Sequence, residues 1–262
     1  MDVRKFIFDN QDYFEDFISR STYHTNAIEG NTLSYAETYA ILFNDNDFKV
    51  SATPREIYEA INHKYAINHI LSHLGEELSE SLIKEAAVLI NKNISEIAGY
   101  RTVAVRIKGA QHVPPAPNQV PQQMMYFVYN YNHTVYEDIF QKLADTHIQY
   151  ERIHPFEDGN GRTGRLILNF ELLRNNMPPI VIPKDDRIKY FDMLAEQNTQ
   201  GLAGFFKELC QEEQKRIEAL TGHRKESVVE RLSKYREQIQ DNRQGDSEIR
   251  DKKLNETRGS ER

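Results

Sequence analysis

This chain of 262 residues contains a single cysteine, Cys210. One thiol excludes a disulfide framework within the chain and a cysteine-rich zinc site. No stretch is continuously apolar for the roughly 20 residues that a membrane-spanning helix needs. Residues 1–17 are interrupted by charges and lack the apolar run of a signal peptide. We therefore expect a soluble, cytoplasmic protein that has no membrane partner.

An excess of basic charge is also absent, because 33 lysines and arginines face 40 acidic residues and the formal net charge is −7. Nucleic-acid backbones and anionic membrane surfaces attract basic proteins, so general binding to either is not expected. A local basic pocket remains compatible with this balance. The length and the hydrophobic content of 39% suffice for one good core and a small accessory domain.

Apolar residues recur at helical spacing over most of the chain. The sequence from Ser34 to Glu37 reads as a capping box that opens a helix. A second start signal runs from Thr53 to Glu56, with Pro54 at the first helical position. After the helix that follows Pro54, further helices are expected over residues 79–94, 120–132, 139–148, 166–175, 185–198 and 202–220.

One segment departs from the helical pattern. Val103, Val105 and Ile107 alternate with more polar residues, which predicts a strand, and Gly109 offers a turn into a second strand. A lone hairpin is marginally stable and usually needs a packing helix or an added peptide strand. We predict an all-α fold with a small β-hairpin flap. The expected regions are an N-terminal helical region at 1–95, a core at 96–220 and a charged, partly disordered tail at 221–262.

The chemistry is concentrated in residues 154–165, HPFEDGNGRTGR. Glycines let the successive N–H groups of Gly159-Asn160-Gly161 turn inward as an anion-binding nest. The start of the following helix adds unpaired donors and partial positive charge. Arg162 and Arg165 are three positions apart, so both guanidinium groups can reach one ligand from one face. Together these features predict a polyphosphate site.

Two side chains of this stretch are candidates for catalysis. Mg²⁺ usually takes one or two protein carboxylates and completes its shell with water and phosphate oxygens, which suits Asp158. The alternative for Asp158 is an ordinary acid at a helix N-terminus. A neutral His154 can take a proton from a hydroxyl nucleophile, and Pro155 predicts an extended backbone for it. Phe156 is expected to be buried and Glu157 exposed.

Glu29 is predicted to lie at the C-terminal end of a helix in the first part of the chain, where a carboxylate is unfavourable. Thr25 and Glu29 are four apart and share one face of a last helical turn, which Gly30 ends by adopting a left-handed conformation. The helix macrodipole disfavours a carboxylate at that end. We infer that another group binds the charge of Glu29; the alternative is an ordinary surface glutamate beside a helix end.

A second histidine pair carries a weaker signal. His69 and His73 have the spacing of a helical metal pair, but no third ligand lies nearby in the sequence. The glutamate that stands between the histidines of HExxH metalloproteases is also missing. We therefore do not predict a metal site at this pair.

Residues 154–165 match HPFxxGNGRxxR at every defined position, and on this signature the chain resembles the Fic (filamentation induced by cAMP) family. The resemblance covers most of residues 25–210. Residues 25–30, TNAIEG, resemble the inhibitory (S/T)xxxE(G/N) motif, placed N-terminal to the core as in class II members. Residues 99–117 are similar to the family's flap hairpin and the turn after it. Residues 187–191, with Asn198, resemble its adenine-side segment.

The resemblance implies a Fic-type helical bundle that transfers AMP from ATP to a protein hydroxyl, a reaction called AMPylation. It implies that His154 deprotonates a target Ser, Thr or Tyr and that Asp158 holds Mg²⁺ between the α and β phosphates. It also implies that Glu29 pairs with Arg165 and displaces the γ phosphate. The other implied roles are phosphate binding by Gly159, Asn160, Gly161, Arg162 and Arg165, adenine contact by Tyr190, Phe191 and Asn198, inhibition by Thr25, Glu29 and Gly30, and target positioning by Val105 and Ile107.

Several alternatives stay open. Members that transfer phosphate carry a bulkier basic residue where Gly161 stands, so Gly161 favours AMP transfer, while the phosphate motif alone leaves phosphocholine transfer open. In some class II relatives the inhibitory glutamate positions water to remove AMP, so Glu29 leaves open that this chain is a hydrolase that removes AMP from a modified protein. A non-enzymatic nucleotide sensor is a third class, and His154 argues against it because a pure binder needs no base. Self-modification and a homodimer both fit the resemblance, and the target protein is not named by it.

Overall fold

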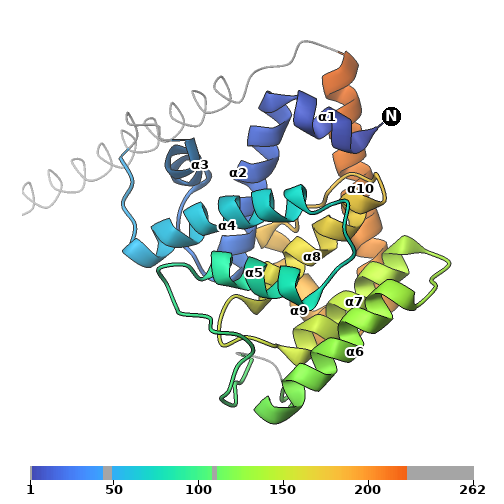
Figure 1. The fold of residues 1–262 in the computed structure, drawn as a ribbon. Coiled ribbons are helices and arrows are strands. Elements are labelled where there is room, and N and C mark those ends of the chain that lie inside the picture. The colour runs from blue at the N-terminus through green and yellow to red at the C-terminus, as the bar shows by residue number, and fades with distance from the viewer. Residues whose placement is uncertain (1, 44–48, 108–110, 223–262) are drawn as a thin grey trace, which may run out of the picture. The chain divides into compact units, whose positions relative to one another are not determined.

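The computed structural model describes residues 2–43, 49–107 and 111–222, and Figure 1 shows that these residues are arranged as a set of packed helices. The α-helices of the described residues are α1 (Val3–Asp9), α2 (Gln11–Ile28), α3 (Tyr35–Phe43), α4 (Pro54–Ser72), α5 (Glu80–Ile90), α6 (Val120–His133), α7 (Ile139–Ile153), α8 (Asn160–Arg174), α9 (Arg187–Ala195) and α10 (Thr199–Gly222). Two short 3-10 helices, η1 (Pro117–Gln119) and η2 (Lys184–Asp186), precede α6 and α9.

The starts of α3 and α4 follow the capping boxes predicted from the sequence. Ser34 N donates to Glu37 Oε2 at 2.9 Å, and Glu37 N donates back to Ser34 Oγ at 3.2 Å. At α4, the Thr53 side chain accepts from the backbone of Glu56, whose carboxylate accepts from Thr53 N, and Pro54 occupies the first turn. Both predicted helix starts are confirmed.

Helix α8 lies in the middle of the packed helices (Figure 1). It packs against α2, α4, α5 and α7. Every residue from Arg162 to Leu173 is buried, which includes the predicted stripe of Leu166, Ile167 and Phe170. One hydrophobic cluster joins α8 to α1, α2, α4, α5 and α6, and a second joins it to α7, α9 and α10. The start of α8 is therefore positioned by the whole core.

The predicted β-hairpin is not formed among the described residues. The chain between α5 and η1 carries no strand where it is described, and the predicted turn at Gly109 lies outside the described residues. Val103 is 51% exposed, while Val105 and Ile107 are half-buried. An isolated two-stranded ribbon has too little packing to stabilise its ladder, which explains why the alternating pattern did not produce strands here. The all-α class is confirmed for the described part.

The residues up to Gly222 pack as one compact unit. No helix in the described ranges is both long and apolar enough to cross a membrane. The predicted charged tail lies outside the described residues beyond Gly222, where α10 ends. The predicted boundary near residue 95 stays a prediction.

Candidate active site

His154 ends α7 with a left-handed backbone, at φ 51° and ψ 62°. The extended conformation predicted from Pro155 is therefore wrong. His154 N still donates to Tyr150 O at 3.0 Å, which completes the last turn of α7 before the chain reverses. A left-handed residue other than glycine costs on the order of 1–3 kcal/mol, so the surroundings must hold it in place.

Arg101 supplies that restraint and was missed by sequence reasoning. Its side chain is buried and donates from Nε to His154 O at 2.8 Å. Its Nη2 donates to Pro115 O at 2.6 Å and to Ile153 O at 3.4 Å. The backbone N of Arg101 donates to Pro155 O at 2.9 Å. Burial lowers the pKa of Arg101. The residue escaped notice because it lies far from the motif in sequence, within the segment 99–117 that resembles the flap hairpin.

The imidazole of His154 is prepared to accept a proton. Its Nδ1 lies 3.3 Å from Glu151 O, a contact that favours the tautomer with hydrogen on Nδ1 and a lone pair on Nε2. Burial lowers the pKa of His154, although the Glu151 carbonyl and the Glu29 charge oppose the shift. The ring is therefore neutral near pH 7, as a general base requires.

The loop after His154 is anchored as predicted at its apolar residue. Phe156 is fully buried and Glu157 is exposed, which confirms both expectations. The side chain of Asn160 accepts from Phe156 N and donates to Phe156 O, both at 2.9 Å. The amide of Asn160 therefore holds the loop, and what it offers an anion is its backbone at the start of α8.

Gly159 is required at the position before α8. It has φ 78°, and a Cβ there would lie 2.7 Å from Asn91 Nδ2 and 2.8 Å from Ile90 Cγ2. Asn91, buried at the end of α5, donates from Nδ2 to Asp158 O at 3.2 Å. No side chain caps α8 among the described residues, so the N–H groups of its first turn remain available to an anion.

Asp158 lies between two arginines. Its Oδ2 accepts from Arg55 Nη2 at 2.5 Å and its Oδ1 from Arg162 Nη2 at 3.2 Å. Burial opposes ionisation, but Arg162 and Arg55 outweigh it and lower the pKa of Asp158. Arg55 is 55% exposed and can move into solvent, which frees one carboxylate oxygen. A charged carboxylate with a releasable oxygen beside an anion site fits Mg²⁺, which takes few protein ligands.

The two motif arginines hold unused donors. Arg162 is the largest fully buried side chain, and its Nη1 lies 3.4 Å from Glu59 Oε1, too poorly placed for a hydrogen bond. Within the described part of the chain, Arg162 Nε and Arg165 Nη1 have no hydrogen-bond partner. A buried donor without a partner costs about 1–3 kcal/mol, so these atoms indicate a ligand rich in acceptor oxygens.

Arg165 reaches the end of α2. Its Nη2 donates to Glu29 Oε1 at 2.7 Å, and its Nε donates to Thr25 Oγ1 at 2.7 Å. The shared face predicted for Thr25 and Glu29 is confirmed, as is the left-handed Gly30 at φ 103°. Glu29 caps the end of α2 with its side chain 35% exposed, whereas the side chain of Arg165 is 7% exposed. The inferred partner of the misplaced acid is therefore this arginine.

Gly161 lies directly beside this ion pair. A Cβ at residue 161 would lie 2.4 Å from Glu29 Oε1 and 3.0 Å from Arg165 Nη1. A larger residue would push the pair aside. Glu29, Arg165 and the first turn of α8 thus converge on one point.

Buried titratable groups lie around Arg165. Burial, helped by the charge of Arg165, lowers the pKa of His147 to about 3. Burial raises the pKa of Glu151 to about 7, although the charge of Arg165 opposes the rise. Tyr190 is fully buried, with its hydroxyl 2.6 Å from His147 Nε2. The predicted contact between Tyr190 and adenine stays a prediction.

The other two adenine-side candidates lie nearer the surface. Phe191 is half-buried, with the guanidinium of Arg187 4.7 Å from its ring centroid. Asn198 is exposed and accepts from Gly201 N at 2.8 Å, next to the start of α10. Their role stays a prediction.

Comparison with known proteins gives one consistent match. The model of the Fic/DOC family matches residues 77–172. The protein adenylyltransferase Fic of Nematostella vectensis is 31% identical over 209 residues, which are 75% of this chain and 47% of that protein. The protein adenylyltransferase fic-1 of Caenorhabditis briggsae is 33% identical over 213 residues, covering 78% of this chain and 41% of that protein. The chain thus spans less than half the length of these relatives.

Solved structures agree. A Fic domain containing signalling protein from Bacteroides thetaiotaomicron has a TM-score of 0.72 and 26% identity, covering 82% of this chain and 91% of that one. A Fic-1 fragment from Caenorhabditis elegans has a TM-score of 0.64 and 30% identity, covering 77% of this chain and 62% of that one.

Proposed function

Because residues 77–172 of this chain are a Fic/DOC family domain, we propose that the protein is a protein adenylyltransferase, which moves AMP from ATP to a side-chain hydroxyl. The supporting observation is the convergence at the start of α8 of a neutral, half-buried His154 with donors of Arg162 and Arg165 that lack partners among the described residues. A base beside an open polyphosphate site suits transfer to a hydroxyl.

In the proposed reaction, Nε2 of His154 takes the proton of a target Ser, Thr or Tyr hydroxyl. The hydroxyl oxygen then forms a bond to the α phosphorus of ATP, and the bond between that phosphorus and the bridging oxygen to the β phosphate breaks. Pyrophosphate leaves with the bonding electrons, and AMP stays on the target. Mg²⁺ held by Asp158 would neutralise charge on the phosphates.

The chain's own contribution is positioning and charge. Arg101 fixes the turn that carries His154, so the base need not be ordered during the reaction. Arg162 and the first N–H groups of α8 would bind the oxygens of the α and β phosphates. Arg165 would bind the γ phosphate, with Nη1 as the donor already free for it.

We further propose that Glu29 restrains this activity. Its carboxylate holds Arg165 at 2.7 Å, in the place that a γ phosphate oxygen would take. Because Glu29 is 35% exposed, its carboxylate can move into solvent, and a γ phosphate oxygen would then pair with the buried Arg165. A net preference of only about 1.4 kcal/mol for the paired state would lower competent ATP binding roughly tenfold.

Isotope transfer tests the reaction. We expect label from α-labelled ATP with Mg²⁺ to reach protein, and His154→Ala to abolish it. His133→Ala, a histidine at the end of α6, is the control and should label normally. Label that arrives only from γ-labelled ATP would replace the proposal with phosphate transfer, and ATP binding without labelling of any protein would replace it with nucleotide sensing. Glu29→Gly should raise labelling. Unchanged labelling would show that Glu29 does not restrain the activity.

One observation favours AMP removal as a second candidate function. Within the described residues, the side chain of Glu29 accepts its hydrogen bond from Arg165 through Oε1, so Oε2 could orient a water molecule. Release of AMP from a pre-modified substrate, lost in Glu29→Gln, would support this activity, and no release by the wild-type chain would exclude it.

The segment at residues 103–107 is a proposed guide for the target. It has no regular secondary structure and pairs with no strand in the described part of the chain, so its backbone could accept a target segment as an added strand. Val105 and Ile107 would flank that segment. The cytoplasmic location, a homodimer and self-modification remain predictions from the sequence.

A further inference from the structure

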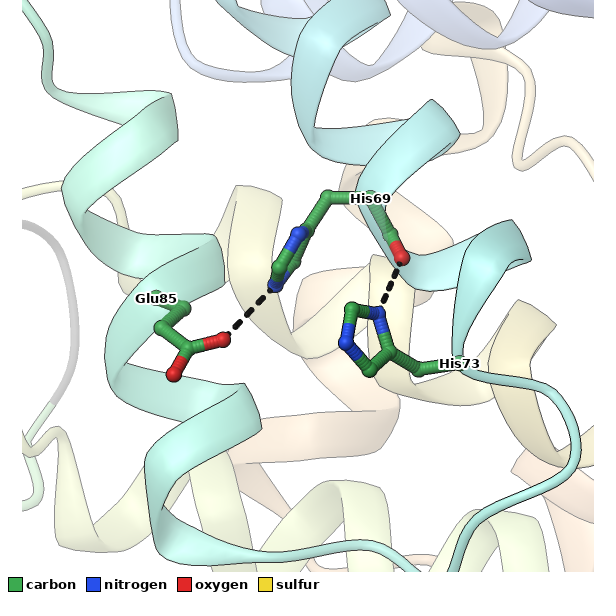
Figure 2. A group of neighbouring side chains, drawn as sticks. All are labelled: His69, His73 and Glu85. Carbon is green, nitrogen blue, oxygen red and sulfur yellow. Dashed lines mark hydrogen bonds and ion pairs between the residues drawn. The ribbon is translucent and has the colours of Figure 1, made fainter.

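Three side chains that take no part in the candidate active site form a cluster on the α4–α5 helix pair, and Figure 2 shows them. His69 lies in the last turn of α4, His73 caps that helix, and Glu85 lies in the middle of α5. His69 Nε2 is 3.0 Å from Glu85 Oε2, and one ligand atom of each residue lies within 4.8 Å of the others. The third ligand absent from the neighbouring sequence is thus supplied by the next helix.

Hydrogen bonds from neighbouring groups already orient the side chains of His73 and Glu85. His73 Nδ1 donates to His69 O at 2.8 Å, with Ser72 Oγ 3.0 Å away, and this leaves Nε2 of His73 with its lone pair. Glu85 Oε1 accepts from Ser81 Oγ at 2.9 Å. Metal-binding histidines almost always donate their second ring N–H, often to a backbone carbonyl, and metal-binding carboxylates are themselves hydrogen-bonded.

We propose that His69, His73 and Glu85 bind a divalent transition-metal ion, with Zn²⁺ as the best match. Two histidines and one glutamate with water in the open position are an established zinc donor set, and imidazole ligands disfavour Mg²⁺ and Ca²⁺. Ligand atoms about 2.0–2.2 Å from a tetrahedral zinc lie roughly 3.4 Å apart. The side chains of His69 and Glu85 are 23% and 50% exposed, so a small rotamer change brings the three atoms to that spacing.

A metal at this position would tie α4 to α5 where the two helices pack together. Both helices also reach the candidate active site. Arg55 on α4 contacts Asp158, and Asn91 at the end of α5 contacts the Asp158 carbonyl. Bound metal would therefore brace two elements that frame the phosphate site, and this inference does not depend on the proposed reaction.

Zn²⁺ titration of the full chain, without a histidine tag and freed of metal by a chelator, tests the site. We expect one Zn²⁺ per chain by competition with a chromogenic chelator. His73→Ala and Glu85→Gln should each weaken the affinity at least about tenfold. Zn²⁺ should raise the thermal midpoint of the wild-type chain and leave the midpoints of both variants unchanged. Circular dichroism of the metal-free proteins verifies that the variants fold.

His133→Ala is the matched control. His133 also lies at a helix end and bonds through Nδ1 to the carbonyl four residues back, at 2.8 Å from Tyr129 O, but its ring stacks on Tyr129 instead of a second histidine. It should bind Zn²⁺ like the wild type. The proposal is overturned if the wild-type chain binds no Zn²⁺, or if His73→Ala and Glu85→Gln bind it with unchanged affinity.

Discussion

Two arginines at α2 are largely shielded from water, and their partners differ in kind. Arg20 lies on α2 with its side chain 13% exposed, and Arg165 contacts the end of α2 with its side chain 7% exposed. Arg20 donates to Asp16 Oδ2 at 2.8 Å and to both oxygens of Glu213 at 2.8 and 3.0 Å. The side chains of Asp16 and Glu213 are 4% and 6% exposed. Among the described residues, the carboxylate that accepts a hydrogen bond from Arg165 is that of Glu29, and the side chain of Glu29 is 35% exposed.

The difference separates an arginine that holds the fold from one that awaits a ligand. Arg20 joins α2 to α10 through carboxylates that cannot reach water, and Tyr13 OH adds a bond to Glu213 at 2.8 Å. Arg165 keeps Nη1 without a partner among the described residues, and its carboxylate can move into solvent. Both guanidinium groups are largely buried, so burial of the cation does not distinguish them. The exposure of the partner carboxylate does, and it indicates which arginine is available to a ligand.

Removing the two partners should have unequal effects on stability. Glu213→Ala leaves Arg20 buried with one carboxylate, and we expect a loss of about 3–5 kcal/mol in the free energy of unfolding. Glu29→Ala removes a partner that is already 35% exposed and leaves Arg165 bonded to the hydroxyl and carbonyl of Thr25, so we expect a smaller loss of about 1–3 kcal/mol. Urea unfolding of both variants measures the difference, and equal losses would contradict the comparison.

The second acid near Arg165 should make stability depend on pH. Burial raises the pKa of Glu151 to about 7 from an ordinary 4.5, so the unfolded chain releases this proton first as the pH rises. The Glu151 contribution therefore favours folding at low pH and is lost between pH 4.5 and 7, by up to roughly 3 kcal/mol. Glu151→Gln should lack this loss and gain stability relative to the wild type as the pH rises from 4.5 to 7.

The difference between the two unfolding curves isolates Glu151. Buried His63 and His147, whose pKa values are lowered to about 3, have the opposite sign and lose stability as the pH falls below about 6.5. Both proteins share that contribution, so it cancels. A pH-independent difference between wild type and Glu151→Gln would show that Glu151 is charged in the folded chain at neutral pH.

A third arginine, the buried Arg101, should affect the reaction rate without affecting nucleotide binding. Arg101 hydrogen-bonds to backbone carbonyls rather than to a carboxylate among the described residues, and it fixes the turn at His154. We expect Arg101→Ala to lower kcat about tenfold, equivalent to roughly 1.4 kcal/mol, with the KM for ATP unchanged. Arg101→Lys should recover part of the loss. A raised KM with normal kcat would assign Arg101 to nucleotide binding instead.

Local features of this chain were predictable and distant contacts were not. The Thr53 capping box, the left-handed Gly30 and the buried stripe on α8 each depend on residues within a few positions of one another. Arg55, Arg101 and Glu85 reach their partners only through packing, so no local pattern indicates them.

The two wrong predictions have a common physical origin. Proline-induced restriction predicted an extended His154, but the end of α7 and the bonds from Arg101 impose a left-handed turn. Alternating side chains predicted a hairpin around residue 107, but the described segment has no packed partner for a ladder. In both cases the tertiary context outweighed a correct local preference.

The affinity for ATP with Mg²⁺ tests the central claim most directly, namely that Glu29 holds Arg165 in the place of a phosphate. Isothermal titration should show Glu29→Gln binding ATP about tenfold more tightly than the wild type, because the amide keeps the shape but loses the charge. Asp16→Asn, the corresponding change beside Arg20, should leave the affinity unchanged. Equal ATP affinities for the wild type and Glu29→Gln would contradict the claim.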